Sequence, residues 1–114
     1  LGTDPTRSGS PHAVVLGDFN AYAMEQPVRA LDAAGWRDAF ALAGVPRPYS
    51  YVYSGLNGRL DHALLSPSLS PLLRGAAEWH INADEPDSVG YAGDNQPGPW
   101  RSSDHDPLLL GLDL

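Results

Sequence analysis

The sequence predicts a strand-rich domain of the α/β (α+β) class with mixed, mostly antiparallel sheets. Three observations support this class: short apolar runs near both ends of the chain, a helix pattern after the first run, and a hairpin pattern in the middle. The length of 114 residues is enough for one domain. The predicted order is a strand, a helical region, three strands, a long loop and a last strand.

The first half of the chain predicts a strand followed by helices. Residues 13–16 form a continuous apolar run bounded by loop-type sequence, which is typical of a buried strand. Residues 26–34 have Pro27 near the start and Gly35 just past the end, the order that favours a helix. Residues 36–43 indicate a second short helical segment, stopped by glycine and proline.

The middle of the chain predicts a β-hairpin. Residues 49–53 are aromatic and β-branched, residues 59–65 form the returning strand, and Asn57-Gly58 is a strong turn dipeptide. Because side chains alternate along a strand, the returning strand presents two sets of residues on opposite faces. One set is Arg59, Asp61, Ala63 and Leu65, and the other is Leu60, His62 and Leu64.

The second half of the chain predicts two strands separated by a long loop. Residues 66–71 indicate a capped turn or a short helix, and residues 76–81 a strand. Residues 82–107 are rich in acidic residues, glycine and proline, with Arg101 as their one basic residue. Long loops in compact domains are functional or disordered. Leu108–Leu112 is a last apolar run and predicts a buried strand.

Composition and charge limit the classes of function. Fourteen acidic residues against seven basic ones, all arginine, give a net charge of −7. This balance argues against a free-standing, sequence-independent nucleic-acid binder, because such a protein needs a basic face for phosphate. It is compatible with an enzyme that meets phosphate through a bound cation, since carboxylates hold Mg²⁺ or Ca²⁺. The absence of cysteine excludes disulfides and thiolate zinc sites, and it suits an oxidising compartment.

The start of the chain predicts that it derives from a larger domain. The chain opens on Leu1 without methionine or a signal peptide, and residues 3–11 are polar and rich in glycine, proline and serine. We therefore expect residues 1–12 to be a loop or linker from a missing upstream half. Residues 13–114 are then the C-terminal part of one domain.

Three short stretches place acidic or imidazole groups where a predicted strand meets a loop. In the first, the apolar strand runs directly into Asp18 and Asn20, which share a side if the strand continues. Asp18 offers anionic oxygen to a hard cation, and Asn20 offers a neutral donor and acceptor for phosphate or water. The alternative is that either residue caps the next helix or forms an Asx turn.

The second stretch places Asp61 inside a strand, between leucines. A buried carboxylate is costly without a partner, and a histidine N–H is the partner we expect. One alternative is an edge strand in which Asp61 faces water or pairs with Arg59. For His62, the alternative to a functional role is an ordinary packed or surface histidine.

The third stretch, residues 102–107, comes just before the last strand. Asp104 is a candidate metal ligand, and His105 is a candidate for proton exchange because imidazole ordinarily titrates near neutral pH. Asp106 precedes a proline that restricts it to extended geometry, so we expect a structural role. The alternative is that Asp104 and His105 are solvated loop residues.

Together the three stretches resemble the second half of the endonuclease/exonuclease/phosphatase superfamily, the deoxyribonuclease-I-like fold. The resemblance spans residues 13–114 and implies the C-terminal half of a four-layer α/β sandwich, with a metal site at one end. Residues 79–86 further resemble a bacterial branch of secreted extracellular nucleases. The three motifs are Gly17-Asp18-Phe19-Asn20-Ala21, Arg59-Leu60-Asp61-His62 and Ser103-Asp104-His105-Asp106-Pro107.

The resemblance also implies roles for five residues, which we expect to converge at one end of the sheets. Asp18 and Asn20 contact the scissile phosphate and the attacking water or its metal. Asp104 is a Mg²⁺ ligand, with Mn²⁺ or Ca²⁺ as alternative ions. His105 is the catalytic histidine at the phosphate, and Asp61 orients it through a hydrogen bond.

Four further residues are expected to shape a substrate loop beside this site without performing the chemical step. They lie within the predicted long loop that follows a strand, and Pro86 and the glycine-rich stretch after it suggest a shaped segment. These residues are Asn82, Asp84, Glu85 and Arg101.

The resemblance leaves part of the site without a counterpart. The family's first half carries an asparagine, a glutamate and a second catalytic histidine, and nothing in residues 1–12 matches them; His12 lies in the wrong place. We therefore expect the chain by itself to be nearly inactive. Half of a sandwich also leaves apolar faces and sheet edges uncovered, so we expect a missing N-terminal half, a homodimer or a strand swap to cover them.

The leading hypothesis is a fragment of a secreted, divalent-metal-dependent phosphodiesterase that hydrolyses nucleic acid. Same-fold alternatives are a phosphatase or a lipid phosphodiesterase, because a fold does not fix the substrate. An alternative of another class is an acidic Ca²⁺-binding or adhesion module that uses the acidic loop, although this loop lacks EF-hand spacing. No apolar run approaches the roughly 20 residues of a membrane span.

Overall fold

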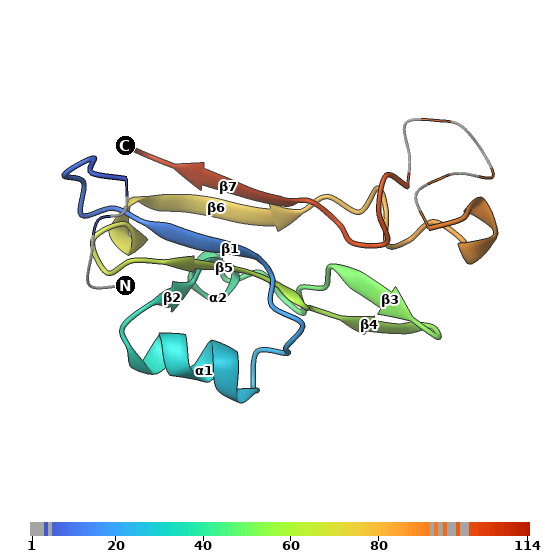
Figure 1. The fold of residues 1–114 in the computed structure, drawn as a ribbon, viewed down its shortest axis with the longest axis horizontal. Helices are drawn as coiled ribbons and strands as arrows, with labels where there is room; N and C mark the ends of the chain where they lie inside the picture. The colour runs from blue at the N-terminus through green and yellow to red at the C-terminus, as the bar shows by residue number, and fades with distance from the viewer. Residues whose placement is uncertain (1–3, 5, 92, 94, 96–97, 99–100) are drawn as a thin grey trace.

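A computed structural model describes residues 4, 6–91, 93, 95, 98 and 101–114. It contains short strands, two α-helices and two 3₁₀ turns, and its strand pairs are all antiparallel within the described residues. Figure 1 shows their arrangement. The elements are β1 (Val14–Asp18), α1 (Gln26–Ala33), β2 (Arg37–Asp38), α2 (Ala39–Ala43), β3 (Tyr51–Tyr53), β4 (Leu56–Gly58), β5 (Asp61–Leu65), η1 (Ser70–Leu72), β6 (Leu73–Glu78), η2 (Asp87–Val89) and β7 (Leu108–Leu112).

The register of one strand pair determines where the site lies. β1, β5 and β2 form a three-stranded sheet in the order β1-β5-β2. β1 pairs with β5 from Val14 opposite Leu65 to Asp18 opposite Asp61. The last residue of β1 therefore lies directly across from the first residue of β5, at the end of the sheet where these two strands meet the loops.

The predicted hairpin is present but closes at a different turn. β3 pairs with β4, not with β5, and the turn residues are Ser54 and Gly55. Both have positive φ, 50° and 76°, as a two-residue turn that matches the strand twist requires. The Asn57-Gly58 dipeptide lies within β4, so the prediction that it forms the turn was wrong. β5 is thereby free to pair with β1.

The helical segment predicted over residues 36–43 is helical only in its second part. Arg37 and Asp38 form β2 and pair with the end of β5. Asp38 is extended because it caps α2: its Oδ1 accepts hydrogen bonds from the N–H groups of Phe40 and Ala41. Gly44, with φ of 68°, ends α2 in the left-handed conformation.

Other predicted boundaries shift by a few residues or include positions outside the described ranges. The strand predicted over residues 76–81 is β6, Leu73–Glu78. The strands predicted over residues 13–16 and over Leu108–Leu112 are present as β1 and β7. The prediction that they are buried was wrong, because exposed residues alternate with partly buried ones in both strands and each lies at the edge of its sheet among the described residues. The predicted loop of residues 82–107 contains η2, but residues 92, 94, 96–97 and 99–100 lie outside the description. The same holds for residues 1–3 and 5 of the predicted N-terminal loop.

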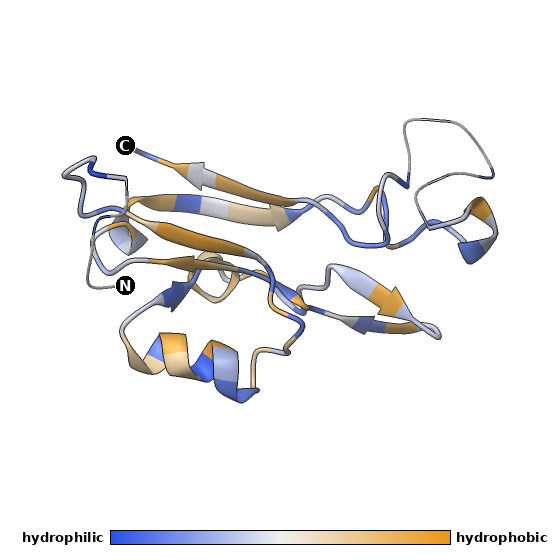
Figure 2. Cartoon of the chain, viewed as in Figure 1, coloured by the Kyte–Doolittle hydropathy of each residue, from blue (hydrophilic) through white to orange (hydrophobic). Residues whose placement is uncertain are grey.

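The core forms where β5, α2, β6 and β7 meet. All five residues of β5 are buried, so both faces of this strand are covered and neither of the two predicted faces is solvent-exposed. Figure 2 shows hydrophobic segments running along β1, β5 and β7. Burial of these side chains is the main stabilising contribution to the fold. The fully buried cluster is Ala39, Phe40, Ala63, Leu65 and Leu69, and Leu72, Leu73, Ala76, Leu108, Leu110 and Leu112 pack against it.

A buried ion pair connects the core to the start of β5. Arg59 binds the Asp38 carboxylate through both guanidinium Nη atoms and lies over the Phe40 ring, 5.3 Å from its centroid. Burial raises the pKa of Asp38, but the Arg59 charge and the backbone N–H donors outweigh it and leave the pKa below its usual value. Arg59 therefore pairs with Asp38, and the alternative pairing with Asp61 was wrong.

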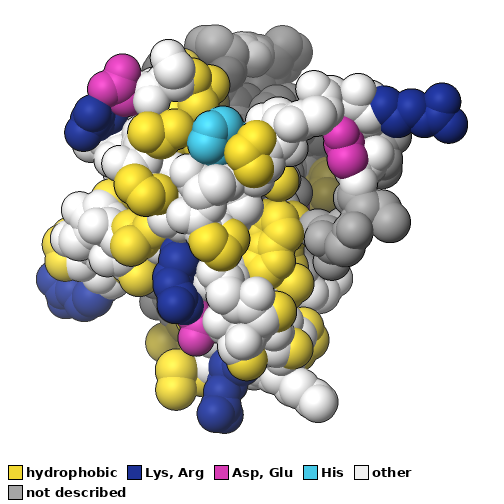
Figure 3. All heavy atoms as spheres, turned by 90° about the vertical axis from the view of Figure 1, so that its left-hand side faces the viewer, with side chains coloured by type: hydrophobic (Ala, Val, Ile, Leu, Met, Phe, Trp, Pro, Cys, Tyr) yellow, Lys and Arg dark blue, Asp and Glu magenta, His cyan; other side chains and the backbone are white. Residues whose placement is uncertain are grey.

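The end of the molecule where both termini lie is a mixed surface. Figure 3 views this end and shows hydrophobic side chains between arginines and a few acidic groups. A hollow here is lined by His12, Val14 and Trp36, among others, and His12 Nδ1 lies 3.2 Å from Ser68 Oγ. His12 thus precedes β1, whose opposite end carries Asp18. Over the part of the chain described, no helix has the length and hydrophobicity needed to cross a membrane.

The packing predicts a clear contrast between two residues of α2. Phe40 is fully buried in the core cluster, whereas Leu42 on the same helix is 48% exposed. Phe40→Ala is expected to lower the free energy of unfolding by about 3–5 kcal/mol, because it leaves a cavity. Leu42→Ala is expected to cost less than about 1 kcal/mol. Urea denaturation followed by circular dichroism measures both, and equal losses would contradict this core assignment.

Candidate functional site

Asp18 and Asp61 face one another across neighbouring strands. They are paired in the β1–β5 register, which places both carboxylates at the same end of the sheet. Asp18 is exposed, and its Oδ1 accepts a hydrogen bond of 2.7 Å from the Asn20 N–H. This is the Asx turn that the sequence left open as an alternative. Asn20 adopts a left-handed φ of 48° and is held next to Asp18 through its backbone.

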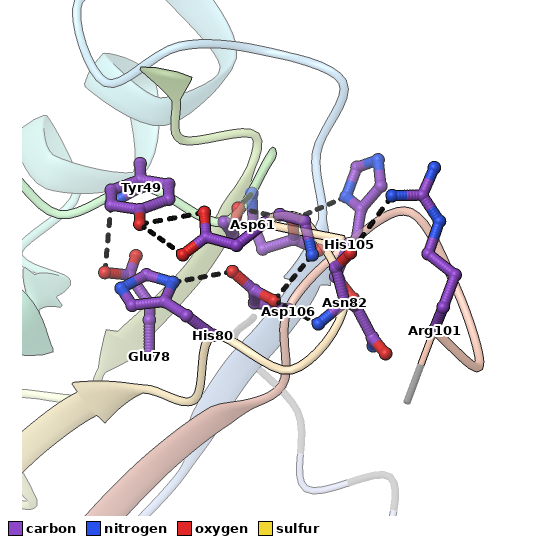
Figure 4. A network of polar contacts seen from close by, with 11 residues as sticks. Tyr49, Asp61, Glu78, His80, Asn82, Arg101, His105 and Asp106 are labelled. Carbon is purple, nitrogen blue, oxygen red and sulfur yellow. Dashed lines mark hydrogen bonds and ion pairs between the residues drawn. The ribbon is translucent and has the colours of Figure 1, made fainter. Parts of the chain in front are cut away.

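Asp61 holds His105 by a short hydrogen bond. The Asp61 Oδ2 atom lies 2.6 Å from His105 Nδ1, so the expected Asp61–His105 contact is present. The same Oδ2 accepts a second bond of 2.6 Å from Ser50 Oγ, and Ser50 is fully buried. Figure 4 shows the Asp61 and His105 side chains pointing toward one another. Because a carboxylate only accepts, His105 carries its proton on Nδ1 and leaves Nε2 for other contacts.

Asp18, Asp61 and His105 form a cluster that fits a divalent cation. One ligand atom from each lies within 4.8 Å of the others. Hydrogen bonds engage Asp18 Oδ1 and Asp61 Oδ2, and the second oxygen of each carboxylate has no protein partner among the described residues. Carboxylate oxygens are the donors that Mg²⁺ or Mn²⁺ prefers, so the second oxygens of Asp18 and Asp61 are candidate ligands, with the His105 ring beside them. The donor set therefore suits such an ion.

Asp104 and Asn20, which were expected to bind the metal, are not part of this cluster. The sequence assigned the metal to Asp104, Asp18 and Asn20, whereas the cluster joins Asp18 to Asp61 and His105. Asp104 lies at the margin of the cluster, with its Oδ1 4.0 Å from His105 Nε2. Four of the five residues expected to converge thus have side-chain atoms at this end of the sheet, and Asn20 reaches it through its backbone N–H.

Asn82 and Asp106 fix the segment that carries His105. The Asn82 Nδ2 donates to the His105 carbonyl at 2.6 Å, and its Oδ1 accepts from the Ser102 N–H. The buried Asp106 Oδ1 accepts from the N–H groups of Asn82 and Ala83. Figure 4 shows this network beside the Asp61–His105 pair. Asp106 therefore has a structural role, as expected, and Asn82 holds the backbone of His105.

Within the part of the chain that the structure describes, the other predicted loop residues, Asp84, Glu85 and Arg101, have no hydrogen bond or ion pair with the cluster. The buried Arg101 donates through Nη1 to the carbonyls of Asn82 and Glu85 and through Nε to the carbonyl of Gly90. Asp84 accepts a hydrogen bond from the Tyr49 hydroxyl. Arg101 thus holds the loop together, and Glu85 takes part through its backbone carbonyl.

A second histidine–aspartate pair, His80 and Asp106, lies in the same polar network and was not predicted from the sequence. His80 Nδ1 lies 2.7 Å from Asp106 Oδ2, and the His80 ring stacks on Tyr49 at 4.1 Å between centroids. The Tyr49 N–H donates to Glu78, whose pKa is raised by burial. In the sequence, His80 was part of a predicted strand, Trp79-His80-Ile81, and nothing in that stretch identified Asp106 or Tyr49 as its partners. Ser50 had no sequence signal beyond its position before an aromatic run.

His62 positions the turn that follows β1. It is fully buried, and its Nε2 donates to the Ala21 carbonyl at 2.8 Å. The Phe19 ring meets the His62 ring edge-on at 5.4 Å. His62 is therefore a packed histidine that anchors the segment containing Asn20. Burial lowers its pKa, although the hydrogen bond to Ala21 opposes this effect.

This burial predicts a pH dependence of stability. The unfolded chain protonates His62 near the ordinary value of 6.5, while the folded state favours the neutral ring. The stabilising contribution is therefore complete above about pH 6.5 and is lost as the pH falls toward the folded pKa. His62→Gln retains a donor for Ala21 and is expected to flatten the unfolding free energy between about pH 7 and 5. His12→Gln, a substitution at an exposed position, is the control, and equal flattening by both would contradict the assignment.

The model of the Endonuclease/Exonuclease/phosphatase family matches residues 2–105 of the chain. No curated protein and no solved structure matches it. Because the match takes in β1, β5 and the segment that ends at His105, the chain belongs to the Endonuclease/Exonuclease/phosphatase family, whose members are generally hydrolases that use divalent metal ions.

Proposed function

We propose that the chain is part of a phosphodiesterase that hydrolyses nucleic acid with a divalent metal ion, Mg²⁺ or Mn²⁺. The observation that carries the proposal is the Asp61–His105 hydrogen bond next to the Asp18 carboxylate. An imidazole oriented by a carboxylate beside a cation-compatible cluster is suited to phosphoryl chemistry. Family membership supports the same class of reaction.

In the proposed reaction, the protein's own groups handle the proton and the phosphate position. Asp61 fixes the His105 ring through Nδ1, so that Nε2 exchanges a proton with the attacking water or the leaving oxygen. The free oxygens of Asp18 and Asp61 would hold the cation, which, when bound, neutralises phosphate oxygens. The Asn20 amide is a neutral donor for the phosphate.

Charge also supports metal dependence. The chain carries a net charge of −7, which repels a polyanion at long range. A cation held by acidic side chains converts part of this negative field into an attractive contact with phosphate. We therefore propose that substrate binding, and not only the chemical step, depends on the divalent ion.

The choice of substrate within the family is proposed from the surroundings of the site. A fold is compatible with several phosphate esters, so a phosphatase or a lipid phosphodiesterase remains the runner-up. Exposed tyrosines next to the site favour nucleic acid, because aromatic rings stack on bases. The resemblance of residues 79–86 to secreted bacterial nucleases supports an extracellular location, and a chain without cysteine is compatible with it. Family membership favours a hydrolase over an adhesion module.

We further propose that the site is completed from outside this chain. The resemblance implies a second catalytic histidine, yet His12 is bonded to Ser68 beyond the start of β1 and His80 is bonded to Asp106. β1 is an edge strand on which Leu16 is exposed, a surface that an N-terminal half or a second copy would cover. The intact parent protein is therefore the appropriate reference for activity.

Nicking of supercoiled plasmid in Mg²⁺ or Mn²⁺ tests the proposal. The intact parent is expected to nick, and His105→Ala in the parent is expected to lower the rate by about a hundredfold or more, since it removes the proton-exchanging group. The 114-residue chain alone is expected to be nearly inactive, because groups that act as a unit are lost together. EDTA is expected to abolish nicking.

Two outcomes would contradict these expectations. A parent whose nicking persists in EDTA, or whose rate is unchanged by His105→Ala, would refute the metal-dependent mechanism. Robust nicking by the chain alone, abolished by His105→Ala, would keep the nuclease and refute the proposal that a missing half completes it.

Asp61→Asn separates the positioning of His105 from the folding of the site. Asparagine is nearly isosteric and still accepts a hydrogen bond, but it removes the charge that fixes and stabilises the imidazole. In the parent, kcat at saturating Mg²⁺ is expected to fall by about tenfold to a hundredfold with little change in the melting temperature. Ser50→Ala, which removes the other partner of the same oxygen, is expected to have a smaller effect. A normal kcat for Asp61→Asn would remove Asp61 from the mechanism.

A further inference from the structure

We infer that one face of the β3–β4 hairpin is a stacking platform for the bases of an unpaired nucleic-acid strand, leading into the site at His105. The platform consists of Tyr22, Tyr51, Tyr53 and Leu56. This inference rests on the proposed function and deepens it, because it names the form of nucleic acid that the site takes. The experiment below distinguishes its failure from a failure of the proposed hydrolysis.

The hairpin has two chemically different faces. Tyr51 pairs with Gly58 and Tyr53 pairs with Leu56, and residues directly opposite one another project to the same face. Val52 and Asn57 pair with each other and project to the opposite face. The sequence alternation thus places the two tyrosines and Leu56 together.

The aromatic face forms a continuous row that ends at the catalytic candidate. Tyr53 is 67% exposed, and its ring lies 14° from parallel to the Tyr51 ring, with 6.4 Å between centroids. The Tyr51 ring in turn lies 4.8 Å from the His105 ring. An isolated β-bridge between Tyr51 and His105 fixes this contact through the backbone. A base on Tyr53 would therefore lie close to a phosphate at the site.

Tyr22 joins the row from the turn after β1, and Gly58 makes room for it. A Cβ added at Gly58 would lie 2.8 Å from Tyr22 Cε1, closer than carbon atoms approach. Gly58 lies opposite Tyr51, so the Tyr22 ring covers the same face of the hairpin. Half of the Tyr22 surface remains exposed, at 50%, and is open to a ligand.

The opposite face repels nucleic acid. A groove there is lined by Val52 and Asn57 of the hairpin together with Asp84, Glu85 and Asp87 of the loop. Three carboxylates around one groove disfavour a phosphate backbone by like-charge repulsion. A strand that reaches the site is therefore directed to the tyrosine face, where the rings are uncharged.

The ligand is an unpaired strand because stacking needs an exposed base face. In a duplex the bases already stack on their neighbours, and only their edges are accessible in the grooves. Exposed tyrosines accept any base, since every base has a π face, so the platform is expected to tolerate sequence. Among the described residues, no arginine stacks on a tyrosine of the platform, so we expect the bases and the metal-bound phosphate to carry the affinity.

Binding by the chain itself tests the platform without relying on turnover. The probes are a phosphorothioate oligothymidylate of about eight nucleotides, the same backbone without bases, and a duplex of that sequence, each titrated in Mg²⁺ by NMR. The oligothymidylate is expected to bind about tenfold or more tighter than the base-free oligomer and the duplex, and to shift the tyrosine ring resonances. Equal affinity for the three probes would overturn the inference.

Matched variants assign the effect to the rings. Tyr53→Phe keeps a ring and is expected to bind the oligothymidylate normally, whereas Tyr53→Leu is expected to lose about tenfold in affinity for it and none for the base-free oligomer. Gly58→Ala is expected to weaken base-dependent binding by displacing Tyr22 while Tyr53 is untouched. Leu42→Ala on α2 is the control for an exposed apolar residue elsewhere. Undiminished binding by Tyr53→Leu would refute the platform.

Separate readouts keep the two proposals apart. Hydrolysis of bis(p-nitrophenyl) phosphate by the intact parent, with and without His105→Ala, reports on the proposed reaction alone. Base-dependent binding without this hydrolysis would retain the platform and refute the hydrolase. Hydrolysis without base-dependent binding would retain the hydrolase and refute the platform. An oligouridylate that binds like oligothymidylate supports a stacking contact, and binding restricted to one sugar would overturn it in favour of sugar recognition.

Discussion

The Asp61 carboxylate is the constraint on which the rest of the site depends. A carboxylate at the start of a buried strand is costly unless donors surround it. Ser50 Oγ and His105 Nδ1 both donate to its Oδ2 atom, each at 2.6 Å. Because the β1–β5 register places Asp18 directly opposite, one charged group links the first strand, the hairpin and the loop before β7.

The loop that carries His105 is held by its own buried polar network. Asp106 accepts from two backbone N–H groups and from His80, and Asn82 binds the His105 carbonyl. Arg101 binds the carbonyls of the same segment. Buried networks of this kind are stabilising only when their members are satisfied, and here the network holds residues 101–106 against residues 80–85. The placement of the imidazole follows from these contacts.

Acidic side chains and exposed tyrosines occupy different surfaces around the site. The acidic side chains favour a cation, and the cation reconciles a chain of net charge −7 with a polyanionic substrate. The hairpin separates uncharged tyrosine rings on one face from carboxylates on the other, through the simple alternation of β3 and β4. The proposed metal chemistry and the proposed base stacking thus meet at His105, whose ring contacts Tyr51.

Local patterns in the sequence determined β1, α1 and β7, because apolar runs and helix-end residues are short-range signals. The pairing of Asp61 with His105 was expected from the family resemblance, and the structure has this contact. Tertiary structure alone decided that β5 pairs with β1, that the hairpin turns at Ser54 and Gly55, and that Asp38 takes Arg59. It also decided the roles of Ser50, His62 and His80. These features depend on which distant strands pair and on which donor reaches a buried group. The residues next to each position in the sequence determine neither.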